Sequence, residues 1–388
     1  MTQQVRLGII GYGSQGGLYA GLLAQGRVAD TVLGAIVDTD PERRALAAAE
    51  HPDAPVLDSL DALLTAGLVD AIVTTVPHFL HPEMGIAALR AGLHVMVEKP
   101  AGVYTAQVEE LNTCAAQHPD LVFAIMFNQR VNPLYQRLKA IVDGGEIGEI
   151  RRSTWIMTSW WRPQGYYDQS EWRATWGGEG GGVLVNQAPH QLDLWQWICG
   201  RPRTVTAKVA EGFRREIAVE NEVTVLADYG DGVTGVFITG THDLVGTDRL
   251  EILGDRGKIV VDDSRRATIT RLVRPEEQIS AELPTEQMRG IFRGETDVSD
   301  LYEVEEIEHV SRFGDQHAVV LANFARAVLD GEPLVAPGSD GIHGVRLANA
   351  VHLSGWTGRE VPLDHDPAEF LAELDDRIRR EGLFPTRT

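Results

Sequence analysis

Cysteine, long apolar runs and positive charge are all scarce in this chain. Only two cysteines occur among 388 residues, Cys114 and Cys199, which excludes a disulfide framework and a cysteine-based metal cluster. No apolar run approaches the roughly 20 residues that span a bilayer. The 35 basic residues are outnumbered by 56 acidic ones, and the formal net charge of −21 would repel nucleic acid and anionic membranes.

The N-terminus lacks the apolar segment and small-residue cleavage site of a secretory signal, because Met1 to Arg6 lead straight into a short apolar strand. We therefore expect a soluble, cytoplasmic protein with neither a membrane nor nucleic acid as its partner. The apolar content of 43% and charged content of 23% are ordinary for a globular protein. A length of 388 residues suits two domains.

Short apolar runs alternate with helical patterns through the first third of the chain. The runs typical of buried strands are Val5–Ile10, Thr31–Val37, Asp70–Val76, Leu93–Val97 and Leu121–Met126. This alternation predicts an α/β domain over residues 1–127, with a parallel sheet covered by helices on both faces.

The pattern changes after about residue 127. Helical stretches at 133–142, 317–329 and 341–356 surround β-rich runs, which lie at 150–159, 205–209, 222–228, 235–240 and 249–253. Asp231-Gly232 and Asp255-Arg256-Gly257 are typical hairpin turns, so the sheet should be largely antiparallel. The acidic stretch 275–311 is expected to have loop character. These features predict a second, α+β domain over residues 128–388.

A phosphate-binding glycine loop follows the first predicted strand. Its residues are Gly11, Tyr12, Gly13, Ser14, Gln15 and Gly16. The first glycine permits the tight turn, the second lets the backbone approach a pyrophosphate, and the third lets the next helix pack closely. The phosphates would lie on free N–H groups at the helix N-terminus. The motif alone also fits a bare structural turn, but its place between a strand and a helix favours a Rossmann dinucleotide-binding unit.

Asp38 ends the second predicted strand and bears on the choice of cofactor. A carboxylate there accepts hydrogen bonds from both hydroxyls of the adenosine ribose and repels a 2′-phosphate, which favours NAD over NADP. Arg43 and Arg44 follow closely, and we expect both on the exposed face of the next helix.

The sequence Glu98-Lys99-Pro100 follows another predicted strand. Open α/β sheets bind ligands at the carboxyl ends of their strands, so Lys99 is a candidate active-site cation. Proline holds the preceding residue in extended geometry and can follow a cis bond. The alternative is a surface lysine before a loop proline.

A second polar cluster lies after a glycine run. Asn186, His190 and Asp193 are spaced by four and three residues, which predicts one shared helical face. A lone histidine is more often structural, but here it has polar company. We find no convincing third ligand beside His190 and Asp193 and therefore expect no metal.

At these residues the chain resembles the Gfo/Idh/MocA family of dehydrogenases over nearly its whole length. The resemblance is carried by the glycine loop, Thr75-Val76-Pro77 with His81, Glu98-Lys99-Pro100, and the segment from Gly181 to Asp193. It implies a Rossmann domain followed by an open-faced, largely antiparallel sheet that carries substrate and forms a homodimer or homotetramer. It also implies that Thr75, Pro77, His81, Glu98 and Lys99 help to bind the cofactor.

The resemblance assigns catalytic roles to Lys99 and His190, with Asn186 beside them. His190 would accept the proton of a substrate hydroxyl while hydride passes to nicotinamide, and Lys99 would stabilise the developing alkoxide. A common family pattern has aspartate where this chain has Asn186 and glycine where it has Ala188. The neutral Asn186 amide can still position a sugar hydroxyl, although no acid at 186 would hold the lysine protonated.

Aromatic residues point to the substrate class. Seven of the eight tryptophans lie between Trp155 and Trp197. Aromatic rings pack on the C–H face of sugars, and neighbouring polar groups bind hydroxyls. We expect Trp155, Trp195 and Trp197 in the core, and His317 as a helix cap. The candidates for substrate contact are Lys99, Gln129, Arg130, Tyr167, Trp172, Arg173, Asn186 and His190.

The Asn186-Gln187-Ala188-Pro189-His190 version of the motif, with Trp172-Arg173 upstream, resembles a branch of the family that acts on glucosides or related hexoses, in which oxidation at C3 is one known activity. We therefore expect an NAD-dependent dehydrogenase that oxidises a secondary hydroxyl of a sugar or glycoside. Inositol dehydrogenase is the alternative enzyme, since a cyclitol would satisfy the same pocket. A non-catalytic regulator that senses dinucleotides is the alternative from another class. Such a regulator needs the glycine loop but not Lys99 and His190.

Overall fold

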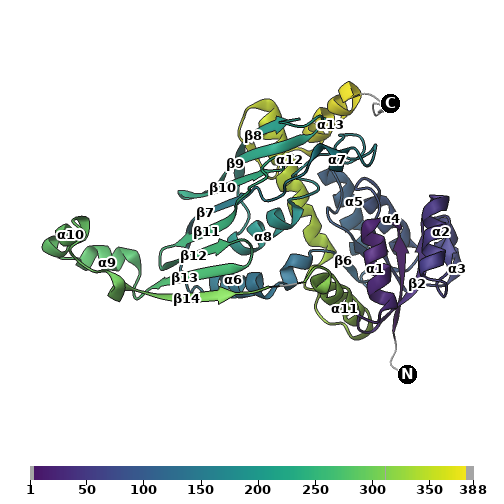
Figure 1. Cartoon of the computed structure of the whole chain (residues 1–388), viewed down its shortest axis with the longest axis horizontal. Coiled ribbons are helices and arrows are strands. Elements are labelled where there is room, and N and C mark those ends of the chain that lie inside the picture. Colours follow the sequence, from purple (N-terminus) through teal and green to yellow (C-terminus); the bar gives the residue numbers. More distant parts are fainter. Residues whose placement is uncertain (1–3, 311, 382–388) are drawn as a thin grey trace.

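Two β-sheets organise the chain, of which the computed structural model describes residues 4–310 and 312–381. In Figure 1 the first sheet and its helices lie at one end of the molecule, and the second sheet fills the middle. No helix of the described residues is long and apolar enough to cross a membrane.

The first sheet has six parallel strands in the order β3-β2-β1-β4-β5-β6. Its strands are β1 (Val5–Ile10), β2 (Thr31–Val37), β3 (Val56–Leu57), β4 (Ala71–Thr74), β5 (His94–Val97) and β6 (Phe123–Ile125). The helices between them are α1 (Ser14–Ala24), α2 (Pro41–Glu50), α3 (Leu60–Ala66), α4 (Leu80–Arg90) and α5 (Thr105–Ala116). The strand order reverses between β1 and β4, and open α/β sheets bind ligands in the crevice at such a point. The predicted parallel sheet is confirmed.

The second sheet has nine strands in the order β14-β13-β12-β11-β7-β10-β9-β8-β15. Its strands are β7 (Ile150–Met157), β8 (Thr204–Glu211), β9 (Glu220–Gly230), β10 (Val233–Gly240), β11 (Asp248–Gly254), β12 (Gly257–Asp262), β13 (Arg266–Leu272), β14 (Tyr302–Glu308) and β15 (Val361–Pro362). All pairings are antiparallel except that of β7 with β10. Both predicted hairpin turns are present, joining β9 to β10 and β11 to β12.

Helices accompany this sheet, and those that lie between it and the first domain close its core (Figure 1). The helices are α6 (Pro133–Asp143), α7 (Gln164–Tyr167), α8 (Pro189–Cys199), α9 (Glu276–Glu282), α10 (Thr285–Phe292), α11 (Asp315–Asp330), α12 (Gly341–Thr357) and α13 (Pro367–Glu381), with short 3₁₀ turns at Asn128–Val131, Ser299–Leu301 and Gly338–Asp340. Trp195 of α8 stacks on Phe237 of β10, and Trp155 packs against the same ring. Trp155 and Trp195 are fully buried, as expected, and Trp197 packs against this core.

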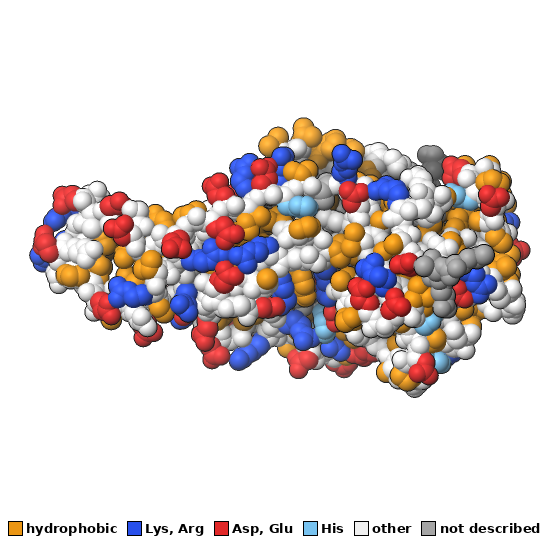
Figure 2. Space-filling model, turned by 90° about the horizontal axis from the view of Figure 1, so that it is seen from below, with side chains coloured by type: hydrophobic (Ala, Val, Ile, Leu, Met, Phe, Trp, Pro, Cys, Tyr) orange, Lys and Arg blue, Asp and Glu red, His pale blue; other side chains and the backbone are white. Residues whose placement is uncertain are grey.

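The acidic stretch 275–311 is not the loop that the sequence indicates. It contains α9, α10 and the edge strand β14, which pairs with β13. Figure 1 shows α9 and α10 projecting from the far end of the sheet, and in Figure 2 basic and acidic side chains are interspersed on this face. Weak periodicity concealed these elements because α9 buries none of its residues and α10 buries only Gly290.

Helix α11 returns to the first domain although it comes late in the chain. Leu321 and Phe324 of α11 are buried in one cluster with Ile9 of β1 and Tyr19 of α1. At the edge of the first sheet, Ile125 donates its backbone N–H to Ala336 O at 3.1 Å. The first sheet is therefore covered by residues from both ends of the sequence.

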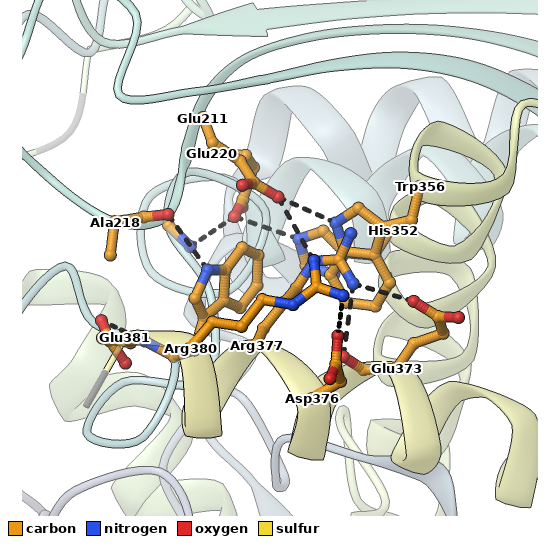
Figure 3. Close-up of polar contacts among 12 residues, drawn as sticks. Glu211, Ala218, Glu220, His352, Trp356, Glu373, Asp376, Arg377, Arg380 and Glu381 are labelled. Carbon is orange, nitrogen blue, oxygen red and sulfur yellow. Dashed lines mark hydrogen bonds and ion pairs between the residues drawn. The ribbon is translucent and has the colours of Figure 1, made fainter. Parts of the chain in front are cut away.

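A buried carboxylate joins β9 to the glycine run that precedes α8. Glu220 accepts backbone N–H groups from Gly182 at 2.8 Å and Leu184 at 3.0 Å, and His352 Nε2 lies 3.1 Å from its Oε2. Glu220 and His352 are fully buried. His352 stacks on Trp356, and the Arg377 guanidinium of α13 lies over the same Trp356 ring, 3.7 Å from its centroid (Figure 3).

We expect Glu220→Ala to destabilise the protein by about 3 kcal/mol or more, because it strands two buried N–H groups and the buried His352. Glu373→Ala is the matched control from the same cluster. Its carboxylate accepts from Arg377 at 2.9 Å but is 41% exposed, and its loss should cost less than about 1 kcal/mol. Thermal and denaturant unfolding measure both effects, and equal losses would contradict the assignment.

Candidate active site

A cavity of about 570 Å³ opens at the carboxyl ends of β5 and β6, where the two domains meet. The first domain contributes the glycine loop and the segments after these strands, and the second domain contributes the segment before α8. The turn into α11 closes the rim. Its lining residues are Gln15, Glu98, Lys99, Met126, Asn128, Gln129, Trp160, Arg162, Asn186, Gln187, His190, Arg312, Phe313, Gly314, Gln316 and His317.

The glycine loop has the geometry of a dinucleotide cradle. No side chain caps α1 at Gly13, so the N–H groups of its first turn are left for a ligand. A Cβ at Gly16 would lie 2.0 Å from Gly11 O, so only glycine lets the helix pack this closely. Gln15 Nε2 is buried without a hydrogen-bond partner among the described residues. Ser14 is exposed at the start of α1. These residues fit a dinucleotide pyrophosphate.

Asp38 lies next to the glycine loop and holds its backbone by a hydrogen bond. Its carboxylate accepts the backbone N–H of Tyr12 at 2.7 Å and that of Asp40 at 2.8 Å. The Tyr12 side chain points away and donates its hydroxyl to Glu50. Oxygen lone pairs remain on Asp38 for ribose hydroxyls.

Of the two arginines after Asp38, Arg43 lies on the exposed face as expected and Arg44 does not. Arg43 is exposed, with its guanidinium 3.9 Å from Asp38 Oδ2. Arg44 is not turned to solvent. It donates to the backbone oxygens of Asp38 at 2.9 Å and Thr39 at 2.8 Å and so holds the end of β2.

The Thr75-Val76-Pro77 segment supports the cavity from beneath. Thr75 Oγ1 donates to Gly11 O at 2.6 Å and thereby fixes the glycine loop. The buried His81 ring has Pro100 O at 2.7 Å and Val76 O at 2.8 Å, one at each ring nitrogen, and so ties the segments after β4 and β5 together. Pro77 is exposed at the turn into α4. Thr75 and His81 therefore position backbone rather than line the cavity.

Lys99 lines the cavity and is half-buried, and its peptide bond to Pro100 is cis. Its Nζ donates to the backbone oxygen of Asn186 at 3.1 Å. Burial lowers the pKa of Lys99, while the negative charges of Glu98 and Glu179 raise it. Position 186 supplies no acid to Lys99, as expected, but Glu98 and Glu179 bring two carboxylates near it.

Two histidines with lowered pKa values, His190 and His317, line this cavity. Burial, the charge of Lys99 and that of His317 lower the pKa of His190 well below its usual value, and its Nδ1 has no hydrogen-bond partner among the described residues. Burial and Lys99 lower the pKa of His317 to about 4. Asn128 Nδ2 lies 3.1 Å from His317 Nε2. Gly314, without a side-chain bond, caps α11, so the expectation that His317 is the cap is wrong.

Asn186, His190 and Asp193 do not share one helical face. Helix α8 begins at Pro189, so Asn186 lies in the turn before it. Asp193 is directed elsewhere and accepts two hydrogen bonds from Arg130, at 2.7 and 2.9 Å. Arg130 also donates to Asp340 at 2.7 Å and is buried. Arg130 therefore joins the segment after β6 to α8 and to the turn before α12 through ion pairs, and, contrary to the expectation, it does not line the cavity.

Asn186 is held by a carboxylate that the sequence analysis did not select. Its side-chain Nδ2 donates to Glu179 Oε1, and Glu179 Oε2 accepts the Ala174 N–H at 2.7 Å. Arg173 Nη1 lies 3.7 Å from Glu179 Oε1. Burial raises the pKa of Glu179, opposed by the Ala174 N–H, Arg173 and the Asn186 amide.

Three candidates for substrate contact, Tyr167, Trp172 and Arg173, do not line the cavity. Tyr167 is buried, with its hydroxyl 2.8 Å from Thr241 Oγ1. Trp172 packs edge-on against His78, and Arg173 lies over the Tyr166 ring. Of the substrate candidates, Lys99, Gln129, Asn186 and His190 do line the cavity. Gln129 Nε2 donates to Gln316 Oε1 at 2.7 Å.

Sequence reasoning missed several lining residues: Asn128, Trp160, Arg162, Gln187, Arg312, Phe313, Gln316 and His317. The run of aromatic and basic residues at Trp160-Trp161-Arg162 was the available signal for that part of the rim. Position after a strand was the available signal for Asn128, which follows β6. The residues at the start of α11 carry no local signal, because only the fold brings them back to β6.

Two family models match the chain. The oxidoreductase family with an NAD-binding Rossmann fold matches residues 5–126, and the GFO/IDH/MocA C-terminal domain matches residues 135–260.

Similar proteins include characterised dehydrogenases. Inositol 2-dehydrogenase of Rhizobium meliloti is 25% identical over 365 residues, covering 92% of this chain and 99% of its own. The NADP(+)-dependent scyllo-inositol 2-dehydrogenase IolW of Bacillus subtilis is 24% identical, covering 93% and 96%. The WlbA dehydrogenase of Bordetella pertussis, solved with NADH and UDP-GlcNAcA, has a TM-score of 0.75 at 25% identity and covers 94% of this chain and 100% of its own.

We expect Asp38→Asn to lower the preference for NAD over NADP by at least about tenfold, because it removes the charge that would repel a 2′-phosphate. Asp40→Asn is the matched control, since it removes a charge two residues away and an asparagine still caps α2. Titration with both cofactors gives the two dissociation constants. An unchanged ratio for Asp38→Asn would rule out this role.

Proposed function

We propose, on the premise that the chain belongs to the GFO/IDH/MocA family of NAD(P)-binding oxidoreductases, that it is an NAD-dependent dehydrogenase that oxidises a secondary hydroxyl of a sugar or glycoside. One observation carries the proposal. Lys99 and His190 line a single cavity, and the cavity begins at the first turn of the cofactor helix α1.

The polar atoms of this cavity favour a ligand with many hydroxyls. Among the described residues, buried atoms without a hydrogen-bond partner include Gln15 Nε2, Asn128 Oδ1, Trp160 Nε1, Arg162 Nε and His190 Nδ1, and all five residues line the cavity. Burying such atoms unpaired is costly. Hydroxyl groups both donate and accept, so a sugar or cyclitol can satisfy this mixed set of donors and acceptors.

His190 has the properties of the base that accepts the hydroxyl proton. Its lowered pKa keeps the imidazole neutral at neutral pH, so a ring nitrogen is free to take a proton. Lys99 is close enough for its charge to act on this ring, which supports a shared role for both groups at one substrate oxygen.

Lys99 would stabilise the negative charge that develops on that oxygen. One of its three donors is engaged by Asn186 O, which leaves donors for the substrate. When bound, the nicotinamide supplies the acceptor for the hydride of the carbinol carbon. The residues of this chain orient the hydroxyl, hold its oxygen at Lys99 and take its proton at His190.

The finer parts of the proposal have separate support. The buried Asp38 carboxylate supports NAD as the preferred cofactor, although IolW uses NADP(+). Oxidation at C3 of a glucoside rests on the Asn186-to-His190 version of the motif. Inositol dehydrogenation is the second candidate, and the inositol dehydrogenases among the similar proteins favour it. We also propose a homodimer or homotetramer through the open face of the nine-stranded sheet.

We expect NADH to form when the protein and NAD are mixed with members of a panel of hexoses, glycosides and inositols. The absorbance at 340 nm measures NADH, and NMR should identify a keto sugar as the product. Lys99→Met should lower kcat at least 100-fold and leave NAD affinity within about threefold. Turnover of inositols alone would favour the second candidate. Tight NAD binding without turnover of any compound would indicate a dinucleotide-sensing regulator.

The pH dependence follows from the lowered pKa of His190. A protonated imidazole cannot accept the substrate proton, so kcat/KM should fall as the pH drops through that pKa. Because the pKa is lowered, this loss should begin below pH 6.5, the usual range of an exposed histidine. The measurement is kcat/KM from pH 5 to 9 with activity re-read after return to pH 7.5. An acidic limb at or above 6.5 would contradict His190 as the base.

A further inference from the structure

Glu179 and Asn186 form a hydrogen bond in which only one of the two side chains can be the donor. A carboxylate only accepts hydrogen bonds, and the amide of asparagine donates at Nδ2 and accepts at Oδ1. Because Asn186 Nδ2 donates to Glu179 Oε1, the oxygen of the same amide is the end left for other partners. No other described residue bonds to this oxygen, and Asn186 lines the cavity.

The carboxylate is anchored well enough to impose this orientation. Glu179 is only 2% exposed. Its second oxygen accepts the Ala174 N–H at 2.7 Å, and Arg173 lies 3.7 Å away. Its own backbone oxygen lies 3.0 Å from His78 Nδ1. Turning the Asn186 amide over would place two acceptors against each other in a buried setting, which is strongly disfavoured.

The same residue holds Lys99 from its other side. Lys99 Nζ donates to the backbone oxygen of Asn186, so the ammonium, the Asn186 amide and the Glu179 carboxylate form one chain of contacts. The ammonium presents donors to the cavity, and the amide presents an acceptor beside them. A substrate hydroxyl bound here could donate to Asn186 while its neighbour accepts from Lys99.

We propose that Glu179 is a positioning residue that makes Asn186 act as a hydrogen-bond acceptor toward a substrate hydroxyl, with the negative charge held one residue behind the contact. This inference rests on the proposed function, because it concerns how that substrate is oriented. Glu179 itself does not line the cavity, so it would not contact the substrate directly and would act on it by orienting Asn186.

The test exchanges the two groups. Glu179→Gln replaces an acceptor by an amide, which can donate to Asn186 and turn its NH₂ into the cavity, so kcat/KM should fall at least tenfold. Asn186→Asp sets two carboxylates against each other and should cause a similar loss. The double variant Glu179→Gln/Asn186→Asp restores one donor facing one acceptor and again presents an oxygen to the cavity. Its kcat/KM should return to within about threefold of the wild-type value.

Glu381→Gln is the matched control for a general loosening of this segment. Glu381 accepts the N–H groups of Trp176 and Gly177, both at 3.1 Å, and therefore holds the same stretch of chain from α13 without contacting Asn186 (Figure 3). Its replacement should lower the melting temperature and leave kcat/KM within about twofold. NAD affinity should be unchanged in all four variants.

The outcomes separate the inference from the proposed function. If the wild-type protein is active, near-normal activity of Glu179→Gln, or a double variant no better than the weaker single variant, would overturn the pairing. If the wild-type protein turns over no sugar or cyclitol, the proposed function fails. The melting temperatures then decide the pairing: a double variant that melts above both single variants supports it, and additive losses overturn it.

Discussion

The tight packing of the glycine run Gly180-Gly181-Gly182 before α8 is the constraint on which the rest of the site depends. A Cβ at Gly182 would lie 1.9 Å from Glu220 O, and one at Gly180 would lie 2.3 Å from a methyl group of Val103. The run is therefore pressed between β9 of the second domain and the segment that follows Lys99 in the first. No residue with a side chain fits there, so the run has little freedom to shift. Asn186 and His190 follow directly and inherit its position.

The charge of Lys99 affects the protonation of the other titratable groups in the cavity. Burial lowers the pKa of the Lys99 ammonium, and the carboxylates of Glu98 and Glu179 oppose this shift. Burial, assisted by the charge of the same ammonium, lowers the pKa of His190 and of His317, so both histidines stay neutral at neutral pH. The proposed base His190 and the proposed oxyanion donor Lys99 are thus mutually dependent, and changing one of them alters the protonation of the other.

Local patterns in the sequence were enough for much of this fold. Apolar runs such as Val5–Ile10 and the loop at Gly11–Gly16 depend on neighbours along the chain, and Lys99 after β5 lies where a parallel sheet binds ligands. The spacing of Asn186, His190 and Asp193 misled because Pro189 starts α8. Proline disfavours helical geometry in the residue before it, so the helix does not extend back to Asn186. Contacts such as Asp193 with Arg130 and Asn128 with His317 join distant segments and leave no periodicity to detect. Glu179 was obscured by the glycines around it.

The late return of α11 to the first sheet has a consequence for how the chain acquires its fold during synthesis. The six strands of that sheet have been synthesised by residue 125, but the apolar surfaces of α1 and β1 that receive Leu321 and Phe324 stay uncovered for nearly 200 further residues. The edge of β6 likewise waits for Ala336. The nascent dinucleotide-binding half is therefore incomplete while the whole second sheet is being translated. Its closure and the delivery of His317 to the cavity occur in the same late step.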